Sequence, residues 1–323
     1  MKIIFTALTA LIISGPAAVA TAQEFPGGKP VRILIGFAPG GGTDIQIRQV
    51  APKLSDVLGV PVVVENRPGA STMLAGQEVA RAAPDGHTLW YSFSGAFAQN
   101  PHTLLNMPYD PFKDFTPISL GARGPQVLVV HPSVPAGSLK EFIAWGKANA
   151  GKVSYASFGT GTSSHIFGEM LAQQTGIDMV HIPYKGVADA ANDLFAGRVH
   201  MIFDAATSSV GYVRAGKVKI FGVVAENRMA LLPDVPTMNE LGTKGIDIIG
   251  WLGYFGPAGM RPELVQRLNA ALAKALAHPE VRDGFARGIY EAVPSTPAEL
   301  AGIVKDSYDR WGALIRRAGI KPN

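Results

Sequence analysis

The sequence predicts an α/β protein of two domains with mainly parallel sheets. From residue 31 onward, short apolar segments rich in Val and Ile alternate with segments of helical length and periodicity. Roughly 300 residues remain after a predicted leader, which is enough for two domains that each have a core. Several apolar segments end in loops of glycine and hydroxyl residues, and ligands of open α/β sheets bind at such strand ends.

The chain begins with a predicted signal peptide, residues 1–22. Lys2 precedes a short apolar run that ends in a small-residue cleavage site, Ala20-Thr21-Ala22. We expect cleavage after about Ala22, with cleavage two residues earlier as the alternative. The run is interrupted by Ser14-Gly15-Pro16 and is short for a membrane anchor. The mature protein is therefore expected in the periplasm.

The composition excludes several classes of function. The formal net charge of +4 falls to +3 without Lys2, and the basic residues form no runs, so we expect no nucleic-acid or anionic-membrane partner. The absence of cysteine excludes disulfides, thiolate metal sites and a catalytic cysteine. The seven histidines show no metal-binding spacing, so neither a metal nor another cofactor is expected.

The predicted elements follow one another as strand and helix along most of the chain. Strands are predicted where β-branched residues cluster between turn residues: 31–37, 60–64, 88–93, 126–131, 153–157, 178–183, 199–203 and 218–224. Helices are predicted where apolar residues recur at helical spacing: 43–58, 72–82, 138–148, 164–175, 187–196, 262–276, 279–287 and 297–317.

No flexible linker separates the two predicted domains. We therefore expect the chain to cross between them through strands, with hinges near 124–131 and 218–224. The first domain would comprise residues 23–124 and 222–323, and the second residues 125–221.

The first predicted loop has the geometry of an anion site. Pro39-Gly40-Gly41-Gly42 ends the first strand, and Thr43 or Asp44 can cap the helix that follows. The first amides of that helix then point at one spot with the positive end of the helix dipole behind them. An ordinary turn that needs glycine for its dihedrals fits this loop equally well.

Three later loops repeat this design: 93–96, 158–164 and 204–209. Two of the four loops lie in each half of the chain, as expected for a ligand cleft between two domains. Nearby aromatic side chains would form either core packing or the apolar walls of that cleft: Phe37, Phe97, Phe158, Tyr184 and Trp251.

Enzyme motifs fail or receive no support. Gly146–Lys152 and Gly211–Lys217 match a phosphate loop for seven positions, but each continues with valine and precedes a strand. No G-x-S-x-G nucleophile elbow occurs. A set of Ser163, His165 or His181, and Asp204 could assemble in space, which leaves an exported hydrolase as the alternative that the spacing does not support.

Eight sequence blocks together resemble one known family. They are Pro39–Asp44, Val62–Ala70, Ala83–Leu89, Pro108–Phe115, Tyr155–Gly161, His181–Gly186, Pro233–Thr237 and Pro257–Gly259. In content and order they are similar to the extracytoplasmic solute receptors of tripartite tricarboxylate transporters, the Bug family. The resemblance covers essentially the whole mature chain.

This resemblance implies a type II-like periplasmic binding protein with a cleft between two domains, and no catalysis. It implies an organic carboxylate ligand, delivered by a monomeric receptor to large and small membrane permease subunits. Phe93 and Phe97 in one loop favour a longer or aromatic acid, dicarboxylates included. A receptor that feeds a membrane signalling kinase is the alternative role.

The family's ligand loops correspond here to residues 37–44 and 157–163. Together with the residue-level analysis, the resemblance predicts a set of ligand-binding residues. These are Phe37, Ala38, Gly41, Thr43, Asp44, Ser94, Phe97, Ser157, Gly159, Gly161, Thr162, Ser163, Tyr184 and Asp204.

Overall fold

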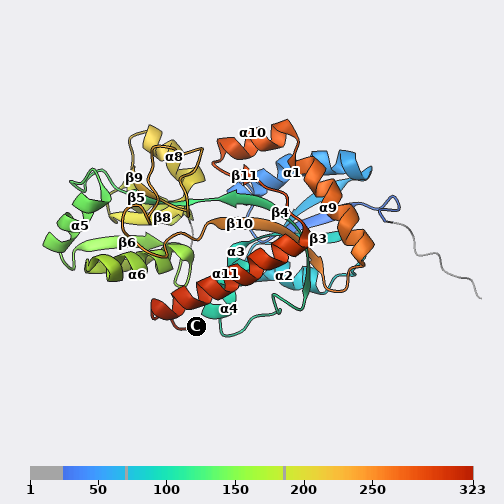
Figure 1. The fold of residues 1–323 in the computed structure, drawn as a ribbon, viewed down its shortest axis with the longest axis horizontal. Coiled ribbons are helices and arrows are strands. Elements are labelled where there is room, and N and C mark those ends of the chain that lie inside the picture. Colours follow the sequence, from blue (N-terminus) through green and yellow to red (C-terminus); the bar gives the residue numbers. More distant parts are fainter. Residues whose placement is uncertain (1–24, 70–71, 185–186, 323) are drawn as a thin grey trace, which may run out of the picture.

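The structure, a computed structural model, describes residues 25–69, 72–184 and 187–322. It has two lobes, each built on one β-sheet, and a long C-terminal helix runs along both of them (Figure 1). The predicted signal peptide, residues 1–22, lies outside the described residues.

The first lobe contains a mixed sheet of six strands from two separate stretches of the chain. The strands are β1 Val31–Ile35, β2 Val62–Asn66, β3 Thr88–Phe93, β4 Phe115–Gly124, β10 Gly250–Pro257 and β11 Glu291–Ala292. Their order is β11-β4-β10-β3-β1-β2. β1 pairs in parallel with β2 and β3, whereas β10 is antiparallel to both β3 and β4, and β11 is antiparallel to β4.

Helices cover both faces of this sheet. They are α1 Gly42–Leu58, α2 Met73–Ala80, α3 Ser94–Ala98, α4 Asn100–Thr103, α9 Pro262–Leu276, α10 Pro279–Arg287 and α11 Pro297–Arg317. On one face, Ile47 of α1 and Leu268 of α9 belong to the same buried cluster as Ile33 of β1. On the other face, Trp90 of β3 packs in a cluster with Leu300 of α11.

The second lobe contains a mixed sheet of five strands. The strands are β5 Gln126–Val130, β6 Val153–Ser157, β7 Met179–Pro183, β8 Met201–Ala205 and β9 Lys219–Val224, and their order is β7-β6-β8-β5-β9. β6 is parallel to β7 and β8, and β5 is antiparallel to β8 and β9.

Four helices flank the second sheet: α5 Leu139–Ala148, α6 Ser163–Thr175, α7 Val187–Phe195 and α8 Ala206–Arg214. Phe142 of α5 and Phe167 of α6 pack in one buried cluster with Phe203 of β8. Leu194 of α7 packs with Ile202 of β8 in a different cluster. Both faces of each sheet are therefore covered, as in doubly wound folds.

Two chain crossings and α11 connect the lobes. The chain passes from β4 to β5 at Pro125 and returns from β9 to β10 through residues 225–249. The first half of α11 packs on the first lobe through Leu300, and its second half packs in the core of the second lobe through Trp311 and Ile315. The predicted domain boundaries near 125 and 221 remain a prediction.

The predicted two-lobed α/β architecture is confirmed, and all sixteen predicted elements are present with bounds shifted by a few residues. The sheets are mixed, however, whereas the sequence predicted mainly parallel pairing. The difference arises because β10 lies antiparallel between β3 and β4, and β5 lies antiparallel between β8 and β9. β4, β10, β11, α3, α4 and α8 were not predicted.

Candidate ligand-binding cleft

A cavity of about 180 Å³ is lined by residues of both lobes. It lies at the carboxyl ends of parallel strands, where α/β proteins bind ligands. Phe37 follows β1, Ser94 follows β3, Ser163 follows β6, and Ala205 ends β8. The remaining lining residues are Thr43, Phe93, Gln99, Gly124, Pro125, Gln126, Ile248, Gly250, Trp251, Leu252, Tyr290 and Trp311.

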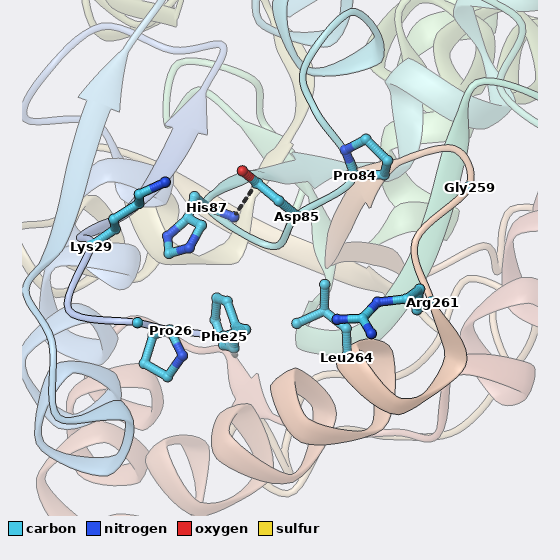
Figure 2. Close-up of a pocket in the computed structure, with 10 residues that line it drawn as sticks. Phe25, Pro26, Lys29, Pro84, Asp85, His87, Gly259, Arg261 and Leu264 are labelled. Carbon is cyan, nitrogen blue, oxygen red and sulfur yellow. Dashed lines mark hydrogen bonds between the residues drawn. The ribbon is translucent and has the colours of Figure 1, made fainter. Parts of the chain in front are cut away.

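Two other cavities are larger. One, of about 470 Å³, is lined only by first-lobe residues, and Figure 2 shows Phe25, Lys29, His87 and Arg261 around it. The other, of about 750 Å³, follows α11 and the segments that connect the lobes. Neither includes the loops after β1 and β6, so the smaller cavity is the better candidate for a ligand site.

The loop after β1 brings the start of α1 to the cavity. Gly40 has φ +83°, a left-handed conformation that favours glycine. Gly41 is the N-cap of α1, and no side chain caps the first amides of the helix. These amides have no partner within the helix, so they are free to bind an acceptor at its positive end. Thr43, in the first turn, lines the cavity.

Asp44 stabilises this loop through hydrogen bonds and does not line the cavity. Its carboxylate accepts hydrogen bonds from the Gly40 amide, Arg48 Nε and Asn66 Nδ2, each at 2.9 Å. Asn66 Nδ2 also donates to the Phe37 carbonyl at 3.0 Å. The hydrogen bond from the Arg48 guanidinium is the main cause that lowers the pKa of Asp44 to about 2.

The loop after β6 brings the start of α6 to the opposite side of the cavity. Gly159 and Gly161 have φ of +122° and +82°. Thr162, the N-cap, donates from Oγ1 to the Gly159 carbonyl at 2.7 Å. Ser163 begins the helix and lines the cavity, where its Oγ accepts from Gln126 Nε2 at 2.9 Å. A Cβ on Gly161 would lie 2.9 Å from Thr103 Cβ of α4, so this loop touches the first lobe.

The described residues that line the cavity include no Asp, Glu, Lys, Arg or His. The polar side chains that line it include the hydroxyls and amides of Thr43, Ser94, Gln99, Gln126 and Ser163. Together with the N-termini of α1 and α6, they can stabilise an anion through neutral donors and helix dipoles.

Aromatic rings form the apolar walls. Phe37 and Phe93 meet edge to face with ring centroids 5.3 Å apart. Trp251 donates from Nε1 to Ser307 Oγ at 2.9 Å, which anchors its indole to α11. Tyr290 packs against Gly124, where a Cβ would lie 2.2 Å from its ring. The body of a ligand in this cavity would therefore meet apolar surface.

The structure places the sequence-predicted residues in three groups. Those that line the cavity are Phe37, Thr43, Ser94 and Ser163. Those that lie in the two loops, away from the cavity wall, are Ala38, Gly41, Asp44, Ser157, Gly159, Gly161 and Thr162. Those that lie elsewhere are Phe97, Tyr184 and Asp204.

These three side chains have partners within the fold. Phe97 is fully buried and stacks on Phe255 with centroids 4.1 Å apart. Tyr184 donates to Asp193 at 2.6 Å, and Asp204 accepts from Ser209 Oγ at 3.0 Å. None of the three lines the cavity, and their role in ligand binding remains a prediction.

Four lining residues were not predicted from the sequence as ligand-binding candidates: Gln99, Gln126, Tyr290 and Trp311. Gln99 follows α3 and Gln126 begins β5, and the sequence pattern of neither element indicates a ligand. Tyr290 and Trp311 lie more than eighty residues beyond the nearest predicted loop and reach the cavity only through tertiary packing. No local signal identifies such residues.

The residues of the alternative hydrolase do not form a catalytic set. Ser163 pairs with Gln126, whereas His165 Nδ1 accepts from the Gly161 amide and His181 contacts Ser157. Asp204 pairs with Ser209. Within residues 25–69, 72–184 and 187–322, no cluster of three or more His, Asp or Glu is suited to hold a metal. In the same ranges no helix has the length and apolarity to cross a membrane.

The family model described as "Tripartite tricarboxylate transporter family receptor" matches residues 46–320. The chain is similar to three solved structures. The periplasmic binding protein BugD is 34% identical, with a TM-score of 0.80 over 91% of this chain and 99% of that chain. Rpa4515 of R. palustris with adipate is 30% identical, with a TM-score of 0.83 over 91% and 98%. MatC of Rhodopseudomonas palustris with bound malate is 32% identical, with a TM-score of 0.77 over 88% and 98%.

The family match covers most of the chain, and these relatives share its two-lobed architecture over nearly their whole length. The chain therefore belongs to the tripartite tricarboxylate transporter receptor family, the Bug-type periplasmic solute-binding proteins.

Proposed function

We propose that this protein captures a compact organic carboxylate in the cavity between its lobes and delivers it to a tripartite tricarboxylate-type permease. The observation that carries the proposal is an uncharged cavity that faces the N-termini of two helices, α1 from one lobe and α6 from the other. A carboxylate bound there would receive amide and hydroxyl hydrogen bonds and favourable helix dipoles from both sides.

The ligands of related proteins agree with this chemistry. Adipate and malate, named for two of the solved relatives, are both carboxylates. The loops at residues 37–44 and 157–163 remain our candidates for the groups that bind the carboxylate. Periplasmic location, export after cleavage near Ala22 and a monomeric receptor are parts of the same proposal.

The size of the cavity favours a small ligand. Its volume of about 180 Å³ is below the roughly 300–1,000 Å³ typical of ligand pockets. Phe93 supports the preference for an aromatic or apolar body, since it lines the cavity, but Phe97 does not reach it. We therefore expect short or aromatic acids to bind more tightly than extended dicarboxylates.

A thermal-shift and calorimetric screen against malate, adipate, benzoate and their amides tests the proposal. Ligand at about one hundred times its Kd should add roughly 2.7 kcal/mol of stability. We expect shifts from acids and none from the matching amides. Equal shifts from an acid and its amide, or no shift from any acid, would contradict carboxylate recognition.

Matched variants then test the site. Ser163→Ala should weaken acid binding about tenfold, because a hydroxyl facing a carboxylate is lost. Thr175→Ala, at the other end of α6, serves as the control and should leave the Kd unchanged. Recovery of intact ligand after incubation separates a receptor from an exported hydrolase.

A further inference from the structure

A histidine stabilises the second candidate loop, residues 157–163, by accepting a hydrogen bond from its backbone. His165, in the first turn of α6, is 7% exposed, and its Nδ1 lies 3.1 Å from the Gly161 amide nitrogen. An amide can only donate, so Nδ1 must be the unprotonated acceptor and the neutral ring carries its hydrogen on Nε2. The amide at the left-handed Gly161 is thereby fixed in one orientation.

A second histidine supports the start of the same loop. His181 Nε2 lies 2.7 Å from Ser157 Oγ, and that hydroxyl accepts from the Gly159 amide at 3.2 Å and donates to the Gly159 carbonyl at 3.2 Å. The two imidazoles stack with centroids 4.0 Å apart and planes 15° from parallel. The loop thus rests on two stacked rings, of which that of His165 is buried and that of His181 is partly exposed.

Few charged groups face this pair. From α6, Glu169 lies 4.0 Å from His165 Nε2, and from β6, Tyr155 stacks on His181 and donates to Glu169. His181 of β7 faces His165, and the neutral side chain of Thr103 in α4 lies next to Gly161. Glu169 is thus the one anion among the described neighbours that would favour an imidazolium.

We propose that neutral His165 is a positioning residue for the carboxylate-binding loop, and that its protonation weakens ligand binding in acid. This proposal depends on the proposed function in one respect, namely that the loop at residues 157–163 binds the ligand. His165 itself does not line the cavity and would act through Gly161.

The direction of the pH effect follows from the hydrogen-bond geometry. A proton on Nδ1 would face the Gly161 N–H, so the bond would be lost and the loop released. Burial lowers the pKa of His165 from its ordinary value of 6.5 and outweighs the opposite effect of Glu169. The affinity should therefore be constant from pH 8 to about 6.5 and fall at lower pH, by up to tenfold per pH unit once His165 titrates.

The test compares malate and benzoate binding by wild type, His165→Asn and His165→Phe between pH 8 and pH 5. Asn can place an acceptor near the position of Nδ1 but does not titrate, so its Kd should match the wild type at pH 8 and lose the acid-specific rise. Phe keeps a ring without an acceptor and should bind about fivefold more weakly at every pH. Protonation of the ligand affects all three proteins equally, and an identical acid response in wild type and His165→Asn would overturn the proposal.

A measurement on the ligand-free wild type separates this inference from the proposed function. Nitrogen-15 NMR should find His165 neutral at pH 7.5 with hydrogen on Nε2, and the Gly161 amide protected from exchange until His165 titrates. Hydrogen on Nδ1, or an unprotected Gly161 amide, overturns the inference. If no acid of the screen binds at any pH, the proposed function fails, whereas the NMR result still decides the role of His165.

Discussion

At the scale of single residues, Asp44 shows how a predicted ligand residue can instead stabilise the site. Asp44 is 4% exposed, and its carboxylate accepts hydrogen bonds from three donors of the protein. It therefore has little remaining capacity to bind a ligand. An acceptor-only group in an anion site would also repel the ligand. Its place in the motif was predictable from the sequence, but its partners were not, because Asn66 comes from β2.

We expect Asp44→Asn to lower stability at neutral pH. The pKa of Asp44 falls from 3.8 in the unfolded chain to about 2 in the folded protein, so its contribution is present above pH 3.8 and is lost as the pH falls through 2. The shift corresponds to about 2 kcal/mol at pH 7. Urea unfolding should show this deficit at pH 7 and a smaller one at pH 3.

The exposed Asp283 of α10 provides the matched control. Asp283→Asn should change stability by less than about 0.5 kcal/mol at either pH. A deficit in Asp44→Asn that stays constant down to pH 3 would argue against the electrostatic explanation.

Gly124 and Tyr290 give a second prediction at this scale. Gly124→Ala places a Cβ 2.2 Å from the Tyr290 ring, which must move out of the cavity wall. We expect ligand binding to weaken about tenfold and stability to fall by about 1–3 kcal/mol, the usual cost of overpacking. Calorimetric titration with the acid that wild type binds measures the first effect.

Gly211→Ala in α8 is the control, because no atom lies within 4 Å of the added Cβ. It should leave the Kd unchanged. Unaltered binding by Gly124→Ala would remove Tyr290 from the proposed site.

At the scale of elements, α11 was predicted with both of its bounds, and β4 and β10 were not predicted at all. α11 has a capping box between Thr296 and Glu299, proline in its first turn and a periodic apolar face, so its signals are local. β4 contains Pro117 and Gly121, which disfavour a strand interior.

The glycines of these strands reflect distant packing. A Cβ at Gly121 would lie 2.7 Å from both Tyr91 and Tyr254, which come from β3 and β10. A Cβ at Gly253 would lie 3.2 Å from Leu300 of α11. Such constraints depend on the completed sheet, so the sequence around each glycine does not reveal them. The mixed pairing of both sheets escaped prediction for the same reason.

Gly302 offers a test of how much α11 stabilises the protein. It lies in the exposed face of the helix, and no atom lies within 4 Å of an added Cβ. Gly302→Ala should therefore raise the free energy of unfolding by about 0.5–1 kcal/mol, through helix propensity alone. Chemical denaturation measures the change, and a destabilised variant would show that the site is more crowded than the structure indicates.

At the scale of the whole molecule, a hydrogen bond joins the lobes close to Tyr290 of the cavity wall. Thr207 Oγ1 of α8 donates to the Gly288 carbonyl, beyond α10, at 2.6 Å. The lobes are also connected by two crossings and by α11 (Figure 1), and Gly161 lies against Thr103 of the first lobe. Binding proteins of this architecture close around a ligand by hinge motion, so a bond across the lobes favours the closed arrangement.

We expect Thr207→Val to weaken ligand binding about three- to tenfold, because the closed form loses the bond to Gly288 and Tyr290 of the cavity wall loses its hydrogen-bond partner Thr207. Thr207→Ser keeps the donor and is the control. Kd values should be paired with small-angle scattering of the unliganded proteins, where the valine variant should be the more extended. Equal Kd values for the two variants would show that this bond does not contribute to closure.

The arrangement of the indole rings gives the molecule a natural optical reporter. The chain has four tryptophans, of which Trp251 and Trp311 line the cavity, and Trp90 and Trp145 do not. Entry of a ligand would change the polarity around these two indoles and thereby their fluorescence, so no attached dye is needed. Unlabelled protein could thus be titrated by its own fluorescence, and replacing Trp90 and Trp145 by phenylalanine would leave a sensor whose light comes entirely from the cavity wall.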